Sequence, residues 1–110
     1  MIVRRGDTIL IVVPGELGKP RPAIVVQADE VGSRRTVIVC PPSSSVEQAS
    51  TLRPVVKPRT ENGLHSRSQI MTDKITAVRR DRVRSVLGRV EPTDVERLEQ
   101  AILVVLGLTQ

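Results

Sequence analysis

The chain has 110 residues, a formal net charge of +5 and no Phe, Tyr or Trp, so a single domain spanning residues 1–110 must build its core from Val, Ile and Leu. No apolar run reaches the ~18 residues of a membrane span, the N-terminus lacks a signal-peptide pattern, and the lone Cys40 excludes a disulfide framework, which together predict a cytoplasmic protein. The positive excess lies in residues 1–90 and comes mostly from Arg, which suits a polyanion such as a nucleic acid.

Short apolar segments separated by Gly, Pro and Ser predict a succession of strands. The first two strands are expected at residues 8–13 and 23–26, joined by a loop with two glycines and two prolines. A third is expected at residues 36–40, where the prolines that follow interrupt the strand.

The rest of the chain continues in the same way. Extended segments are predicted at residues 52–58, 73–78 and 86–90, with a basic turn or single helical turn at residues 79–84. A helix is predicted at residues 92–106, because apolar residues recur at helical spacing between an initial proline and a terminal glycine. Several short strands and one terminal helix indicate a mainly β protein with a small, strongly bent barrel.

Arg21 stands between Pro20 and Pro22 at the entrance of the second predicted strand. The two prolines fix φ on both sides of it, and Pro22 favours an extended conformation for Arg21 itself. A permanently charged guanidinium held in this way suits a phosphate. The alternative is that the Pro-Arg-Pro sequence merely ends a loop with a charged residue.

Three predicted loops carry chemical groups at strand ends. If these loops converge, they would place a carboxylate, a hydroxyl and guanidiniums around one pocket, which is enough to cleave RNA by acid–base catalysis without a metal. Each residue also has a simpler interpretation: a solvated carboxylate or histidine, a turn-capping serine, or an ordinary surface ion pair. The candidates are Glu16, Lys19 and Arg21 in the first loop, Ser43 in the second, and His65, Arg67 and Asp73 in the third.

Several segments, taken in order, resemble the MazF/PemK (Kid) toxins of bacterial toxin–antitoxin systems. They cover nearly the whole chain and end with the C-terminal helix. The resemblance rests on Gly6-Asp7 and on residues 19–26, 37–44, 70–75 and 87–90.

This resemblance implies an SH3-like barrel with a C-terminal helix, the CcdB/MazF-type plasmid maintenance toxin fold, assembled as a homodimer. It implies a metal-independent endoribonuclease that requires no cofactor, cuts single-stranded mRNA within short sequences and leaves a 2′,3′-cyclic phosphate. A cognate antitoxin would inhibit it by laying a disordered acidic tail over the same groove. Arg21 matches the catalytic arginine of the family, Ser43 the position of its catalytic threonine, Asp73 an acidic residue of Kid-type members, and Glu16 a loop acid of some members.

The chain also departs from the family pattern. Residues 8–10 replace the usual aromatics, Lys74 replaces a common Gln, and Met71 occupies the position of a functional arginine. Because aromatic side chains are absent, RNA bases would have to stack on Arg planes or on His65.

The leading hypothesis is an mRNA-cleaving toxin in which Arg21 stabilises the transition state and Ser43 holds or orients the scissile phosphate. Asp73 and Glu16 are candidates for the general base, and His65 is a weaker one. The basic side chains expected to bind the RNA are Lys19, His65, Arg67, Arg79 and Arg80.

Two rivals remain open. A non-enzymatic gyrase poison of the CcdB type would share the fold, but this chain lacks the Trp-Gly-Ile terminus of those toxins. A catalytically decayed relative would bind RNA or a partner without cleavage. A dimer is expected from the resemblance and because Leu103 and Val104 widen the apolar stripe of the predicted helix beyond what one face needs. The alternative is that this surface packs against the sheet of its own barrel.

Overall fold

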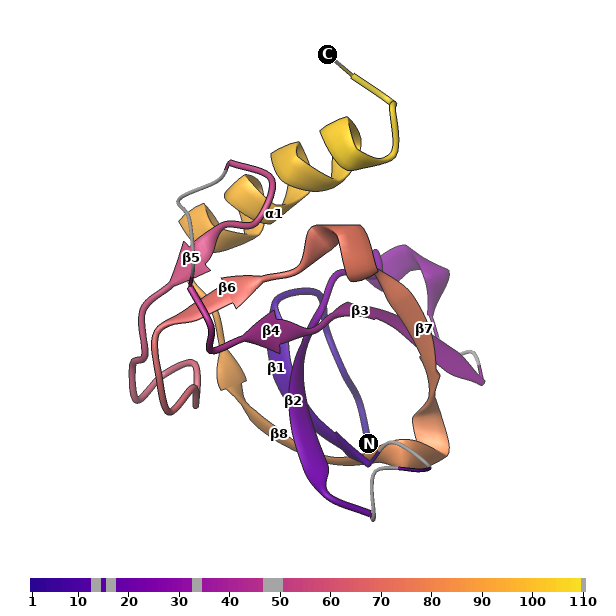
Figure 1. The fold of residues 1–110 in the computed structure, drawn as a ribbon. Helices are drawn as coiled ribbons and strands as arrows, with labels where there is room; N and C mark the ends of the chain where they lie inside the picture. The colour runs from indigo at the N-terminus through magenta and orange to yellow at the C-terminus, as the bar shows by residue number, and fades with distance from the viewer. Residues whose placement is uncertain (13–14, 16–17, 33–34, 47–50, 110) are drawn as a thin grey trace.

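The computed structural model describes residues 1–12, 15, 18–32, 35–46 and 51–109 (Figure 1). Within these residues short strands dominate, and one α-helix comes last. The strands are β1 (Asp7–Val12), β2 (Pro20–Val25), β3 (Thr36–Cys40), β4 (Pro42–Ser43), β5 (Val55–Val56), β6 (Ser68–Ile70), β7 (Thr76–Arg79) and β8 (Val83–Arg89). The helical elements are the 3-10 turns η1 (Asp29–Val31), η2 (Thr72–Lys74) and η3 (Arg80–Arg82), and the helix α1 (Pro92–Val105).

Five strands form a curved antiparallel sheet in the order β7-β3-β2-β1-β8. The pairing of β1 with β8 shifts register twice, between Thr8 and Ile9 and between Leu10 and Ile11. Such irregularities increase the local twist and bend the sheet. In Figure 1 the five strands curve into a ring, and η3 closes it by joining β7 to β8.

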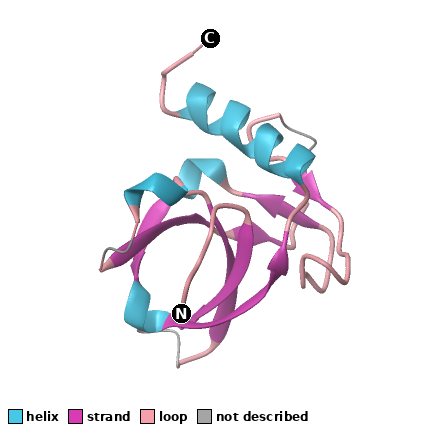
Figure 2. Ribbon diagram, turned by 180° about the vertical axis from the view of Figure 1, so that it is seen from behind, coloured by secondary structure: helices cyan, strands magenta, loops and turns pink. Residues whose placement is uncertain are grey.

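A second sheet, in the order β4-β6-β5, lies beside the ring, and α1 packs next to it (Figures 1 and 2). Between these elements and the ring lies a cluster of buried apolar side chains, here named the helix-side core. Leu98 of α1 is buried in it, so the helix is held by packing rather than by propensity alone. Its buried members are Ile24, Val26, Cys40, Val56, Leu64, Ile70, Val90 and Leu98.

The other face of the five-stranded sheet carries a separate apolar cluster, here named the ring-side core. Side chains alternate along a strand, so Ile24 of β2 belongs to the helix-side core while Ala23 and Val25 belong to the ring-side core. The buried members of the ring-side core are Ile9, Ile11, Ala23, Val25, Val37 and Val39.

This architecture confirms the predicted fold class, a mainly β barrel with a C-terminal helix. The predicted strand at residues 52–58 shrinks to the two residues of β5, and the predicted segment 73–78 begins as the turn η2 before β7. Pro42 does not end strand pairing, because it opens β4 and pairs with Ile70 at the edge of the second sheet.

The helix α1 begins at Pro92 as predicted and ends at Val105, one residue before the predicted end. The backbone N–H of Glu91 donates to the Asp94 carboxylate at 3.3 Å, which satisfies a donor next to the first turn. The buried residues of α1 are Leu98 and Ala101, while Val95 and Ile102 of the predicted apolar stripe are partly buried against the helix-side core. Across the described residues, no helix has the length and apolar character to cross a membrane.

Candidate active site

A cleft of about 940 Å³ opens beside the ring-side core, and Arg21 lines it together with Pro20 and Pro22. Arg21 shares one face of β2 with Ala23 and Val25, because side chains on that face recur every second residue. Its backbone is paired with that of Ile11 in β1. The sheet therefore fixes the base of this side chain, while the exposed guanidinium faces a hollow large enough for a ligand.

The titratable side chains that line the described part of the cleft are all basic. They are Arg21, His65, Arg79 and Arg82, and no Asp or Glu of the described residues joins them. A concave surface with one sign of charge and apolar walls concentrates ligands of the opposite sign. The cleft therefore suits an anion, and its arginines suit phosphate groups in particular.

The polar lining residues that were not singled out from the sequence are Ser44, Ser66, Ser68, Thr76 and Arg82. Arg82 belongs to the basic turn predicted at residues 79–84, but that turn holds four arginines and the sequence alone does not tell which of them face inward. Ser44 belongs to a run of three serines, where the same ambiguity applies. Which arginine and which serine face the cleft depends on how the strands pair, and the sequence does not show this pairing.

Ser43 lies next to the cleft, since its neighbours Pro42 and Ser44 both line it. Its own hydroxyl bonds locally: Oγ accepts from the backbone N–H of Ser45 at 3.2 Å and lies 3.5 Å from the carbonyl of Ser45. This is the turn-capping arrangement common for serine. In this conformation Ser44 is the member of the run that faces the cleft.

Asp73 lies in η2, outside the lining of the cleft. Arg53 holds its carboxylate with two hydrogen bonds, of 2.8 Å to Oδ1 and 2.7 Å to Oδ2. These bonds keep the pKa of Asp73 below its usual range. The structure therefore does not bring Asp73 together with Arg21; it places the carboxylate in a bidentate surface ion pair.

Cys40 closes β3 and is fully buried in the helix-side core. Burial, assisted by the nearby negative charge of Asp73, raises the pKa of its thiol to about 12. The thiol therefore stays protonated near neutral pH and packs as a small apolar group.

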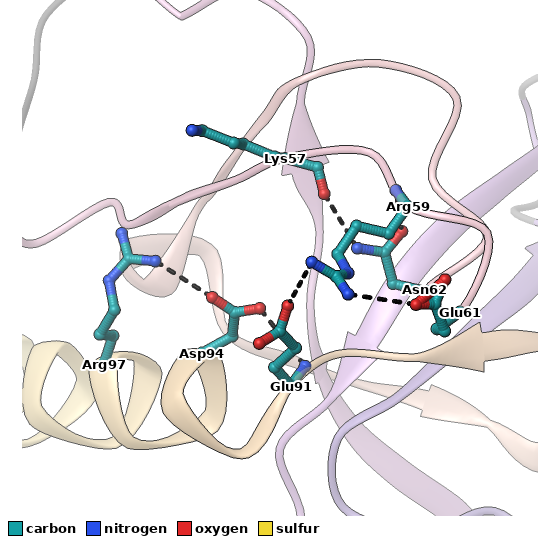
Figure 3. A network of polar contacts seen from close by, with 7 residues as sticks. All are labelled: Lys57, Arg59, Glu61, Asn62, Glu91, Asp94 and Arg97. Atoms are coloured by element: carbon teal, nitrogen blue, oxygen red, sulfur yellow. Dashed lines mark hydrogen bonds and ion pairs between the residues drawn. The ribbon is translucent and has the colours of Figure 1, made fainter.

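The loop that carries His65 to the cleft is built around the buried side chain of Asn62 (Figure 3). Its Oδ1 accepts from the backbone N–H of Arg59 at 3.1 Å and of Leu64 at 3.0 Å, and its Nδ2 donates to the carbonyl of Lys57 at 2.9 Å. An amide side chain can thus satisfy three backbone groups that would otherwise be left unpaired in a tight loop.

The same loop is tied to the start of α1 by a short ionic network (Figure 3). The Arg59 guanidinium contacts Glu61 at 3.1 Å and Glu91 at 2.8 Å. Two hydrogen bonds keep the pKa of the Glu61 carboxyl below its usual range: the larger effect comes from a bond with the backbone of Glu61, and the smaller from the bond with Arg59. Arg97 bonds the carboxylate of Asp94 at 3.1 Å.

Gly63 and Gly88 allow this loop to lie directly on β8. A Cβ on Gly63 would lie 2.6 Å from the Leu87 carbonyl oxygen, and one on Gly88 would lie 2.4 Å from the Glu61 carbonyl oxygen. Gly63 also has a φ of +68°, which favours glycine. Gly63 therefore provides both the positive φ of the turn and the close approach to β8.

The remaining predicted residues are dispersed. Arg79 lines the cleft, and its guanidinium pairs with Asp81 at 2.5 Å. Lys19 and Arg67 are exposed beside lining residues. Arg80 instead lines a second, smaller cavity. Glu16 lies outside the described residues.

The arrangement can therefore hold an anion by several arginines and surround it with hydroxyls and one imidazole. Among the described residues, no group of three or more His, Cys, Asp or Glu side chains lies together as metal ligands would. Stabilising a phosphate that gains negative charge is the chemistry that such a site performs best.

Comparison with known proteins gives a family and a relative. Residues 4–106 match the family described as PemK-like, MazF-like toxin of type II toxin–antitoxin system. The chain is 36% identical over 107 residues to a protein of Mycolicibacterium smegmatis named "Probable endoribonuclease MazF", covering 96% of this chain and 98% of the relative.

Solved structures share the fold. A mycobacterial endoribonuclease in complex with its cognate antitoxin superposes with a TM-score of 0.79 at 16% identity, covering 99% of each chain. The Mycobacterium tuberculosis toxin MazF-mt6 gives a TM-score of 0.78 at 18% identity, covering 94% of this chain and 99% of that one.

Proposed function

Because the chain belongs to the family of PemK-like, MazF-like toxins of type II toxin–antitoxin systems, we propose that it is an endoribonuclease that cleaves single-stranded mRNA without a metal. In this reaction the 2′-oxygen attacks the adjacent phosphorus and the bond to the 5′-oxygen breaks. The products are a 2′,3′-cyclic phosphate and a new 5′-hydroxyl.

The observation that carries the proposal is Arg21, held by β2 at the mouth of a basic cleft. Negative charge gathers on the phosphorane in the transition state, and a fixed guanidinium stabilises it without reorganisation. Arg79 and Arg82 would hold flanking phosphates. Lys19 and Arg67, at the edges of the cleft, would contact the RNA backbone farther along.

The candidates for the general base differ in whether they line the cleft and in the bonds that hold them. His65, the weaker candidate from the sequence, lines the cleft. Asp73 could act only after releasing Arg53, which holds both of its carboxylate oxygens. Ser43 could hold the scissile phosphate after turning away from the Ser45 backbone, and Ser44 could do so as it stands. Glu16 remains a candidate on sequence grounds.

The decisive experiment incubates the purified protein with a long single-stranded RNA in EDTA and maps the ends of the fragments. We expect cuts within a short preferred sequence and cyclic phosphate termini. Arg21→Ala should lower the rate by about 10²- to 10³-fold, as removal of a transition-state donor does. Arg4→Ala is the matched control, because Arg4 is exposed and does not line the cleft. Cleavage that persists in Arg21→Ala would contradict the proposed role.

We further propose that the protein acts in the cytoplasm as a homodimer and is inhibited by a cognate antitoxin with an acidic segment. The basic cleft would receive such a segment in place of RNA. Val104 and Leu106, which are 41% and 52% exposed near the end of α1, supply apolar surface for a partner chain. Sedimentation at micromolar concentration tests the dimer: a species of only 12.1 kDa would exclude it.

A second candidate is an RNA-binding relative without nuclease activity. The observation that favours it is that the Ser43 hydroxyl and the Asp73 carboxylate are both engaged in bonds away from Arg21. Salt-dependent RNA binding without cyclic phosphate products would establish this alternative. The gyrase-poison hypothesis is disfavoured by the family match.

A further inference from the structure

His65 is the one side chain in the 110 residues with a flat aromatic ring, because the sequence contains one His and no Phe, Tyr or Trp. The ring is exposed and lines the same cleft as Arg21. Proteins that hold single-stranded RNA stack its unpaired bases on such rings or on guanidinium planes. The composition therefore leaves one position where a base can stack on a ring.

The backbone next to this ring is held unusually firmly for a surface loop. Asn62 accepts the N–H of Leu64, the residue before His65, and Leu64 is itself buried in the helix-side core. Gly63 donates from its N–H to the carbonyl of Arg59 at 3.1 Å and lies against β8. The loop thus fixes the backbone position of His65. A bound base therefore has to restrict less conformational freedom when it stacks on the imidazole.

The surroundings of the ring suit a base as well as a phosphate. The same cleft presents aliphatic side chains, among them Leu10, Val12 and Leu87, beside its arginines. A nucleotide has both parts: a flat apolar face and a charged phosphate. Arg21 is placed to bind the phosphate, and His65 is placed to stack on a neighbouring base.

We propose that His65 is the base-stacking residue of this cleft, and that it acts through its ring face rather than through proton transfer. This inference rests on the proposed function, because it takes RNA as the ligand. It assigns to one residue the part that several aromatic side chains play in other single-strand binders.

The test compares His65→Phe, His65→Leu and His65→Ala with the unmodified chain. Phe keeps a ring face and cannot titrate, whereas Leu keeps apolar volume without a ring. Each protein is assayed for affinity to one short single-stranded RNA of mixed sequence, and for the rate and positions of its cleavage. Thr60→Ala is the control, since Thr60 is exposed in the same loop and does not line the cleft.

We expect His65→Phe to bind the RNA more tightly than His65→Leu and His65→Ala do, because only Phe keeps a ring face. His65→Leu and His65→Ala should weaken RNA binding by about five- to 150-fold, the range that corresponds to the loss of one stacked base. Loss of activity in His65→Phe equal to that in His65→Ala would overturn the stacking role and favour proton transfer. Unchanged binding in His65→Leu would overturn it as well.

These outcomes separate the inference from the proposed function. If the unmodified protein binds RNA without cleaving it, the nuclease proposal fails, while the ranking of the His65 variants in binding still decides the stacking role. If the protein cleaves RNA and the His65 variants match it, the stacking role fails alone.

Discussion

The two faces of the five-stranded sheet are built from the same strands and differ in what covers them. On one face Ile24 and Cys40 pack in the helix-side core, to which α1 contributes Leu98 and the second sheet contributes Val56 and Ile70. On the other face Ala23 and Val39 lie under an open cleft rimmed by arginines. Because neighbouring residues of one strand face opposite sides, Ile24 of β2 packs in the helix-side core while Ala23, one position away, lines the cleft.

The comparison also separates the polar groups. On the helix side, carboxylates and guanidiniums are paired with each other, as in Arg53–Asp73 and Arg59–Glu91. In the cleft, the described lining residues include basic side chains and no carboxylate. The lining of the cleft is therefore basic, and the carboxylate of Asp81, which pairs with the lining Arg79, does not itself line it. Predictions that act on one face and spare the other test this division.

The largest expected effect is on the closed face. Leu98→Ala removes a side chain that is 2% exposed within the helix-side core and should destabilise the protein by about 2–5 kcal/mol. RNA cleavage per folded molecule should not change, since Leu98 does not line the cleft. Denaturant unfolding gives the first quantity, and activity normalised to the folded fraction gives the second. If Leu98→Ala lost activity while remaining fully folded, the two faces of the sheet would not have separate roles in stability and ligand binding.

The next largest effect is expected at Gly88 of β8, where the loop that carries His65 lies on the strand. In Gly88→Ala the new methyl group would lie 2.4 Å from the Glu61 carbonyl oxygen and 2.7 Å from the Asn62 carbonyl carbon, so the loop must move. We expect a destabilisation of about 1–3 kcal/mol together with weaker RNA binding, because the displaced loop carries His65. Ser85→Ala on the same strand is the control for β8. Destabilisation without any change in binding per folded molecule would show that the loop does not position the cleft.

Those parts of the fold that depend on local chemistry could be predicted from the sequence. Pro20 and Pro22 set the conformation around Arg21 by sterics alone, and Pro92 marks the start of α1 in the same way. Thr36–Cys40 is a strand with the predicted limits, because an unbroken β-branched run lies between polar and proline boundaries.

The rest of the site depends on contacts between residues far apart in the chain. Arg53 and Asp73 are 20 positions apart, and nothing local marks them as a pair. A run of three serines cannot reveal that Ser44 rather than Ser43 faces the cleft, because that choice follows from the pairing of β4 with β6. The short strand β5 owes its existence to its neighbour β6 rather than to its own two valines.

A smaller effect is expected from one arginine of the open face. Arg82 lines the cleft, whereas Arg84, two residues further along, is exposed and does not line it. Arg82→Ala should reduce the slope of log binding constant against log salt by about 0.7, the contribution of one single-strand phosphate contact. Arg84→Ala should leave the slope nearly unchanged. Equal slopes in the two variants would mean that the cleft is not the path of the RNA backbone.

The smallest effect is expected from the ion pair on the closed side. The pKa of Asp73 is depressed in the folded protein, mainly by its hydrogen bond with Arg53, so its contribution to stability is present above the pKa of an ordinary Asp and is lost as pH falls through the lower, folded value. Asp73→Asn should therefore cost about 0.2–1 kcal/mol at pH 7, typical of an exposed pair, and less at an acidic pH where the Asp73 carboxyl becomes protonated in the folded protein. Denaturant unfolding at the two pH values measures the difference. If Asp73→Asn instead leaves stability unchanged and abolishes RNA cleavage, the carboxylate must leave Arg53 to act in the reaction, and the separation of the two faces fails at this residue.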